Sequence, residues 1–155
     1  MVLLLYFSMN NYRGKNGYMS ENTVRIIDLP KIVDRRGNLS IIEEMKDIPF
    51  EIKRCFWIYD VPGGEVRGSH AYRETEEFIV ALSGSFDVVI DDGKVKQIFS
   101  LNRSYYGLYV PKMMWRQMQN FSTNSLALIV TNTEFNRDDY IYDYDLFLKE
   151  KSNEK

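Results

Sequence analysis

The sequence predicts an all-β fold, a barrel or a sandwich built from short strands. Short runs rich in β-branched and aromatic residues recur from about residue 24 onward. Turn residues such as Gly, Pro, Asn and Asp separate these runs at intervals of roughly eight to twelve residues, which is typical of barrels and sandwiches. No apolar stretch with helical period is long enough to cross over between parallel strands, which argues against a doubly wound α/β fold.

The expected strands and turns follow one another in chain order. A turn at residues 34–38 separates the first two strands, and a Pro-Gly-Gly sequence at residues 62–64 ends the third. The end of the chain is expected to be a short helical or irregular segment at residues 138–151. The expected strands are residues 24–29, 39–44, 52–61, 77–82, 85–90, 95–101, 107–110 and 125–131.

The clearest hairpin lies in the middle of the chain. Phe86, Val88 and Ile90 alternate with other residues, so they share one face of a strand and are expected in the core. The Asp-Asp-Gly sequence at residues 91–93 is a strong turn signal, because glycine adopts a positive φ where the chain reverses. We therefore interpret the two aspartates as turn residues and not as metal ligands.

The length of 155 residues suits one domain, which we place at residues 21–150. Residues 1–20 are expected to be a disordered tail or the product of a misassigned start codon. Their apolar run at residues 2–7 is too short to span a bilayer, and it has neither the preceding basic residues nor the cleavage site of a signal peptide.

Composition narrows the function classes further. A formal net charge of −2 gives no general attraction to nucleic acid or to a membrane surface. Cys55 is the single cysteine, so an intramolecular disulfide is excluded, which fits a cytoplasmic protein. His70 is the single histidine, so histidine-rich metal sites and catalytic histidine pairs within one chain are excluded as well.

Two constellations of residues carry the functional signal. In the first, Gly64, His70, Tyr72, Glu77 and Gly84 are separated by five, one, four and six residues. The second begins after a glycine at position 107. It consists of Pro111, Met113, Arg116 and Asn120.

Together these constellations resemble the two motifs of the cupin superfamily, so we expect a double-stranded β-helix, the cupin or jelly-roll barrel. Metal-binding cupins place two His and a Glu in the first motif and another His in the second. Here the corresponding positions hold His70, Tyr72, Glu77 and Arg116. A guanidinium is permanently charged and cannot ligate a cation, so we predict no metal in this site.

A narrower resemblance extends over about residues 24–148. The sequence Arg-Gly-Ser-His-Ala-Tyr at Arg67–Tyr72 resembles the Arg-Gly-x-His-Ala-His segment of the dTDP-4-oxo-6-deoxy-glucose 3,4-ketoisomerases, metal-free cupins of the WxcM-like C-terminal type. Further similar segments lie at residues 34–39, 48–54, 107–110 and 138–145. The resemblance implies a cytoplasmic enzyme of deoxyamino-sugar biosynthesis that acts on a dTDP-linked 4-oxo-6-deoxyhexose without any cofactor. It also implies a homodimer with exchanged N-terminal strands.

The same resemblance assigns roles to individual residues. His70 is expected to remove the C3 proton, which gives an enediol that is reprotonated at C4, because imidazole titrates near neutral pH. Tyr72 has no counterpart in the family, but a phenol can donate and accept a proton, so Tyr72 is expected to act beside His70 as a proton relay. The substrate-binding residues are expected to be Arg36, Arg54, Arg67, Glu77, Tyr109, Trp115 and Arg116, of which the first three suit a pyrophosphate or the sugar.

Two departures from the family pattern leave alternatives open. Tyr72 stands where the family has its second histidine, and Phe56 stands where it has a proton-shuttling tyrosine. Tyr59 is three positions further on and does not repair the match. The alternatives are a non-catalytic dTDP-sugar or carbohydrate-binding cupin and a related sugar epimerase.

Several side chains admit both a functional and a structural interpretation. Glu77 either supports a pocket or pairs with a base such as Arg73. Arg116 either contacts a ligand or forms a structural ion pair. Three alternating tyrosines, at positions 140, 142 and 144, are expected to pack on the barrel or on a partner chain.

Overall fold

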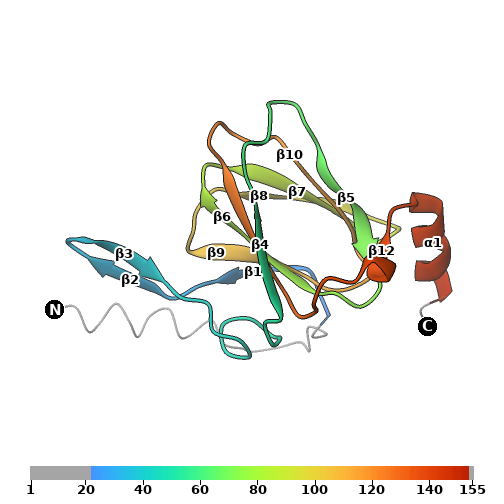
Figure 1. Cartoon of the computed structure of the whole chain (residues 1–155), viewed down its shortest axis with the longest axis horizontal. Coiled ribbons are helices and arrows are strands. Elements are labelled where there is room, and N and C mark those ends of the chain that lie inside the picture. The colour runs from blue at the N-terminus through green and yellow to red at the C-terminus, as the bar shows by residue number, and fades with distance from the viewer. Residues whose placement is uncertain (1–21, 154–155) are drawn as a thin grey trace.

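The computed structural model describes residues 22–153, which form two facing five-stranded sheets, a projecting hairpin and a C-terminal helix (Figure 1). The first sheet has the strand order β1-β9-β6-β11-β4 and the second β12-β5-β10-β7-β8. Neighbouring strands in both sheets are antiparallel. The elements are β1 (Arg25–Asp28), β2 (Lys31–Asp34), β3 (Gly37–Ser40), β4 (Arg54–Ile58), β5 (Arg67–Tyr72), β6 (Glu77–Ser83), β7 (Phe86–Asp91), β8 (Lys96–Leu101), β9 (Tyr106–Val110), β10 (Trp115–Gln119), β11 (Leu126–Thr131), η2 (Arg137–Asp139), β12 (Tyr140–Ile141) and α1 (Tyr144–Asn153).

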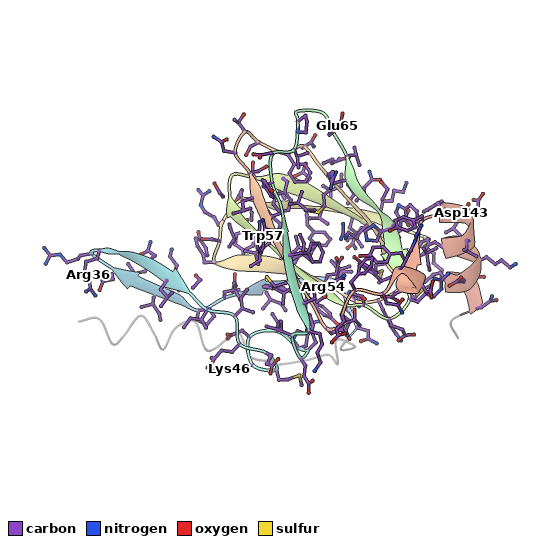
Figure 2. All side chains as sticks on the ribbon, viewed as in Figure 1. Arg36, Lys46, Arg54, Trp57, Glu65 and Asp143 are labelled. Carbon is purple, nitrogen blue, oxygen red and sulfur yellow. The ribbon has the colours of Figure 1, made fainter. Side chains whose placement is uncertain are left out.

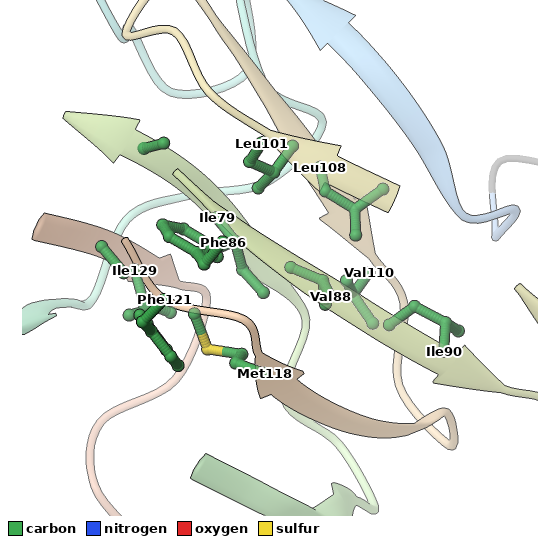
Figure 3. Close-up of a cluster of buried hydrophobic side chains, with 12 residues drawn as sticks. Ile79, Phe86, Val88, Ile90, Leu101, Leu108, Val110, Met118, Phe121 and Ile129 are labelled. Carbon is green, nitrogen blue, oxygen red and sulfur yellow. The ribbon is translucent and has the colours of Figure 1, made fainter. Parts of the chain in front are cut away.

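The main core fills the space between the two sheets (Figure 3). Phe86, Val88 and Ile90 of β7 are all buried in it, as their alternation predicts. Ile79 from β6 and Ile129 from β11 enter from the opposite sheet. Because side chains alternate across a strand, the residues at odd positions of β6 and β11 face this interior.

Each sheet is also covered on its outer face. Leu29, Ile48 and Phe50 pack on the outer face of the first sheet. Phe147 of α1 is completely buried against the second sheet, in a cluster that includes Ala71 of β5. The barrel therefore has an interior and two outer layers, and a side chain's position along its strand decides which of them it joins.

The hairpin of β2 and β3 extends away from the body of the molecule (Figure 1). It carries apolar side chains that remain exposed, namely Ile32, Val33 and Leu39. Val33 is 71% exposed. We call residues 31–40 the arm.

The turn at residues 91–93 is confirmed. Asp91 Oδ1 accepts a hydrogen bond from the backbone N–H of Gly93 at 2.8 Å. Asp92 Oδ1 accepts from the N–H groups of Lys94 and Val95, both at 2.8 Å. Gly93 has a φ of +88°, which a residue with a side chain rarely adopts.

Other predicted elements differ from the structure. The expected strand at residues 39–44 ends at Ser40, and Lys31–Asp34 form a strand that was not expected. Strands β5 and β10 were also not expected, because their glycine, histidine and arginine interrupt the alternation of apolar and polar residues.

The expectation for residues 1–20 lies outside the described part of the chain. Within residues 22–153, no helix is long and apolar enough to cross a membrane.

Candidate active site

His70 lies on β5, on the interior side of the second sheet, directly opposite Arg116 of β10. It is 7% exposed, and its Nε2 atom has no hydrogen-bond partner. Burial, reinforced by the positive charge of Arg116, lowers the pKa of His70 to about 3. The imidazole is therefore neutral at physiological pH and can accept a proton.

Arg116 forms a buried ion pair with Glu77 of β6, across the barrel interior. Its Nε and Nη2 atoms donate to the two carboxylate oxygens of Glu77, each at 2.7 Å. The two side chains are only 2% and 1% exposed. Burial by itself would lower the pKa of Arg116, but the charge and hydrogen bonds of Glu77 outweigh this effect and raise the pKa. The guanidinium therefore stays charged.

One nitrogen of this guanidinium remains available. Arg116 Nη1 is buried and has no hydrogen-bond partner, as is also true of His70 Nε2. A buried N–H without an acceptor is costly, so a ligand oxygen at this point would be favoured. Arg116 thus fits both interpretations at once, since two of its nitrogens hold Glu77 and the third is free for a ligand.

Gly68 creates the space in which Arg116 approaches His70. A Cβ atom at Gly68 would lie 1.9 Å from Arg116 Nη1 and 3.7 Å from His70 Cε1. Gly68 also has a φ of +67°, so both the conformation and the space favour glycine here. The glycine of the Arg-Gly-Ser-His sequence is therefore part of the site's geometry.

Aromatic rings surround the other side of His70. The ring of Tyr72 lies 4.7 Å from the imidazole, that of Tyr140 5.0 Å and that of Tyr142 5.8 Å. Tyr72 and Tyr140 contact each other edge to face at 4.6 Å. Burial, together with the negative charge of Glu77, raises the pKa of Tyr72, so its phenol stays protonated.

Arg54 lies at the edge of this cluster. It begins β4 and pairs in register with Thr131 of β11, which in turn pairs with Glu77. Its Nε atom donates to Thr131 Oγ1 at 3.4 Å, and its guanidinium lies over the rings of Phe56 and Phe135. The Phe135 ring contacts Tyr140 at 5.8 Å, so a chain of contacts connects Arg54 with His70.

Trp115 and Tyr109 do not join this cluster, contrary to the expected pocket role. Trp115 lies on the outer side of β10, where its ring packs against Tyr144 and Phe147. Tyr109 packs in the outer layer of the first sheet, and its hydroxyl donates to the Glu76 carboxylate. Side chains alternate along a strand, so the residues next to them face inward: Arg116 follows Trp115, and Leu108 precedes Tyr109.

Arg36 and Arg67 are both exposed in this chain. Arg36 lies at the tip of the arm, whereas Arg54 lies in the body of the molecule (Figure 2). The Arg36 side chain is 91% exposed and pairs with Asp34 at 2.8 Å. Arg67 begins the strand of His70 and is exposed.

Sequence reasoning missed two parts of the site, Gly68 and Tyr140. The alternating tyrosines were noted, but their pattern alone does not distinguish a catalytic cluster from an outer packing layer. Two surface hollows, lined mainly by residues 57–63 and 121–126, include no residue of the His70 cluster. We assign the site on its chemistry rather than on the size of a hollow.

Comparison with known proteins agrees with this arrangement. The family described as FdtA, WxcM-like, C-terminal, matches residues 22–152. The TDP-4-oxo-6-deoxy-α-D-glucose-3,4-oxoisomerase of Aneurinibacillus thermoaerophilus is 41% identical over 125 residues, which are 81% of this chain and 90% of the relative.

The similar solved structures include several 3,4-ketoisomerases. A 3,4-ketoisomerase from Helicobacter canadensis is 38% identical with a TM-score of 0.82, over 84% of this chain and 98% of that chain. A TDP-fucose-3,4-ketoisomerase from Campylobacter jejuni is 41% identical with a TM-score of 0.80, over 85% and 98%.

A dTDP-4-dehydrorhamnose 3,5-epimerase from Bacillus anthracis has a TM-score of 0.69 over 81% of each chain. At 15% identity, this likeness shows a shared fold alone. The expected cupin-type β fold is confirmed. The sequence match over residues 22–152 and the 41% identity to the oxoisomerase show that this chain belongs to the FdtA family of WxcM-like C-terminal domains.

Proposed function

We propose that this protein is a 3,4-ketoisomerase that acts on a TDP-linked 4-oxo-6-deoxyhexose. The observation that carries the proposal is a neutral, buried imidazole with an unpartnered Nε2 atom, beside a guanidinium with an unpartnered Nη1 atom. The names of the similar enzymes, 3,4-oxoisomerase and 3,4-ketoisomerase, support the reaction class.

The first step is removal of the proton at C3 of the sugar by His70. A proton next to a ketone is only weakly acidic, so the base must be unprotonated and held at the reacting carbon. The lowered pKa of His70 keeps its imidazole in the accepting form at neutral pH. The electron pair of the C3–H bond then forms a C3–C4 double bond, and negative charge develops on the oxygen at C4.

Arg116 is suited to stabilise this charge. Its free Nη1 lies in a buried region, where a preorganised donor stabilises a developing oxyanion far more strongly than in water. Glu77 holds the guanidinium in place before the substrate arrives. We therefore assign Arg116 to the oxyanion and Glu77 to its positioning.

Reprotonation at C4 completes the isomerisation. The imidazolium formed in the first step returns a proton to C4, and the keto group forms at C3. Tyr72 lies beside His70 with a protonated phenol, so we assign it the transfer of protons between the two sugar oxygens. Proton transfers alone interconvert the two ketones, so the proposal requires neither a metal nor a redox cofactor.

The substrate class rests on two structures of a similar enzyme from Thermoanaerobacterium thermosaccharolyticum. One holds TDP, at 31% identity. The other carries a histidine-to-asparagine substitution and holds TDP-4-keto-6-deoxyglucose, at 30% identity. Arg54 and Arg67 are the basic groups of this chain that we assign to the sugar or its diphosphate. We place the enzyme in the cytoplasm, consistent with its single cysteine.

We further propose a homodimer in which the arms are exchanged. The arm exposes Ile32, Val33 and Leu39, an apolar surface that a second copy would cover. Exchange would also explain the place of Arg36, which lies at the tip of the arm and away from the His70 cluster of its own chain (Figure 2). We assign Arg36 to the substrate site of the partner.

The test is incubation of the wild-type protein with TDP-4-oxo-6-deoxy-glucose in D₂O, followed by NMR. We expect a 3-oxo isomer and solvent deuterium in the sugar ring. Absence of both would refute the proposal. If calorimetry then still detected tight binding of the TDP-sugar, the protein would be a non-catalytic sugar-nucleotide-binding cupin.

A further inference from the structure

The proposed isomerisation moves hydrogen on oxygen as well as on carbon. While the C3 proton is transferred to C4, the hydroxyl proton on O3 must leave and a proton must arrive on O4. His70 handles the carbon-bound proton, so hydroxyl groups are needed for the oxygens, and Tyr72 supplies one of them. Phe56, which packs against the main core from β4 with Arg54 over its ring, has no hydroxyl and cannot supply one. This inference rests on the proposed function.

Tyr140 is a second tyrosine of the cluster, and its ring contacts both His70 and Tyr72. Its ring lies 5.0 Å from the imidazole and 4.6 Å from the Tyr72 ring. Tyr140 and Tyr72 are also cross-strand partners in the pairing of β12 with β5, so both project from the same face. Tyr142 stacks on Tyr140 but is 64% exposed, which leaves it less suited to a relay inside the site.

The backbone of Tyr140 is fixed by several groups. Arg73 Nη1 donates to the Tyr140 carbonyl at 3.3 Å and to the Asp138 carbonyl at 2.6 Å. The buried Asp139 carboxylate accepts from the backbone N–H groups of Glu74 at 2.7 Å and Thr75 at 3.2 Å. The segment before β12 is thus tied to the loop that follows β5, and Tyr140 is held in place without a ligand.

We propose that Tyr140 is a catalytic residue that forms a two-phenol relay with Tyr72. One phenol gives its proton to O4, takes a replacement from the other phenol, and the second phenol receives the proton of O3. Two O–H bonds of the enzyme break and two form, so the relay returns to its starting state in each turnover. Both phenols contact His70, and His70 is the cross-strand partner of Arg116, the group assigned to the oxyanion, so the relay lies on the same side of the site as the oxygens it serves.

The relay can be separated from the base by measuring two rates in one sample. Deuterium exchange at C3 of the recovered 4-oxo substrate in D₂O requires His70 and the oxyanion donor Arg116, but no proton transfer between the two sugar oxygens. Net formation of the 3-oxo isomer also requires proton transfer between the oxygens. For Tyr140→Phe, which keeps the ring and removes the hydroxyl, we expect isomerisation to fall at least ~100-fold, since a positioned proton donor typically contributes 10²–10⁴-fold. Exchange at C3 should continue at close to the wild-type rate.

Tyr72→Phe should show the same separation of rates, and Tyr59→Phe, which removes an exposed phenol outside the site, should change neither rate. Circular dichroism and urea unfolding establish that each variant is folded. Wild-type isomerisation by Tyr140→Phe would overturn the relay, as would an equal loss of exchange and isomerisation. If the wild type showed neither rate, the proposed function itself would fail, which is a different result from failure of the variant alone.

Discussion

The pKa of His70, the residue proposed as the base, is set by burial and by one neighbouring cation. An exposed imidazole would titrate near pH 6.5 and would be protonated at pH 5. In this chain, burial and Arg116 both disfavour the protonated form and lower the pKa to about 3. The neutral form, which is the one able to accept a carbon-bound proton, therefore persists well into the acid range.

The pH profile of isomerisation follows from this shift. Because the pKa is lowered, kcat/KM of the wild type should remain almost constant between pH 8 and pH 5. A base with the ordinary pKa would lose about thirtyfold between its plateau and pH 5. Initial rates at saturating and limiting substrate check this, with circular dichroism at each pH to verify folding. A tenfold loss per pH unit beginning near pH 6.5 would contradict the assigned environment of His70.

The ion pair of Glu77 and Arg116 gives a second prediction, concerning stability. Glu77→Gln leaves a buried guanidinium without its counter-charge, and breaking a buried pair in this way typically costs about 3–5 kcal/mol. The double variant Glu77→Gln with Arg116→Met removes that unpaired charge, so it should be more stable than the single variant. Urea unfolding measures both. If the free energy of unfolding of Glu77→Gln lay within about 1 kcal/mol of the wild-type value, the buried guanidinium would not depend on Glu77 for its counter-charge.

At the scale of elements, the hairpin of β7 and β8 was predictable because its signals are local. Alternation places Phe86, Val88 and Ile90 on one face, and glycine permits the turn. Strands β5 and β10 were not predictable from periodicity, because Gly68, His70 and Arg116, which form the candidate site, interrupt the apolar pattern. Sequence patterns are expected to fail in this way where a functional site lies.

The residues that hid strands β5 and β10 are the same residues that made the candidate site predictable. The unusual residues at motif spacing identified His70, Tyr72, Glu77 and Arg116, and the structure brings these four together. The sequence could not show which aromatic side chains point away from the barrel interior. Trp115 packs on the outer side of β10, and this orientation depends on how β10 pairs with its neighbouring strand.

The attachment of β12 to the barrel gives a prediction at this scale. Arg73→Met removes the hydrogen bonds to the Asp138 and Tyr140 carbonyls and the ion pair with Glu150. We expect isomerisation to fall about tenfold or more, because small displacements of a catalytic group are costly. The melting temperature should change by only a few degrees, since a partly exposed ion pair contributes about 1 kcal/mol or less.

Lys112→Met is the matched control for this variant. It removes the exposed ion pair with Glu74, close in sequence to the Arg73 contacts, and leaves the β12 hydrogen bonds intact. Both rate and melting temperature should stay near the wild type. An Arg73→Met protein with unchanged turnover would show that the position of Tyr140 does not depend on this anchor.

At the scale of the whole molecule, the arm is the feature that one chain leaves unexplained. The side chains of Val33 and Leu39 are exposed and are not part of the barrel's core. Substituting both with Asp should leave the fold of the chain intact and weaken the proposed dimer. Burial of one such side chain contributes about 1.5–3 kcal/mol, and a symmetric dimer would lose four of them, so the dissociation constant should rise by at least about 10⁴-fold.

Sedimentation equilibrium over a range of concentrations measures this effect. If the wild-type protein were monomeric at micromolar concentration, the proposed exchanged dimer would be refuted. A variant that dimerises as tightly as the wild type would show that the interface lies elsewhere.

Comparison of His70→Gln with the wild type decides whether His70 is the base. His70→Gln keeps a polar side chain of similar length but cannot take up a carbon-bound proton. At pH 7 we predict that its kcat falls by about 10²–10⁴-fold, the usual contribution of a general base, while its affinity for TDP stays unchanged. Turnover by His70→Gln at the wild-type rate, with a folded protein that binds TDP, would show that His70 is not the base.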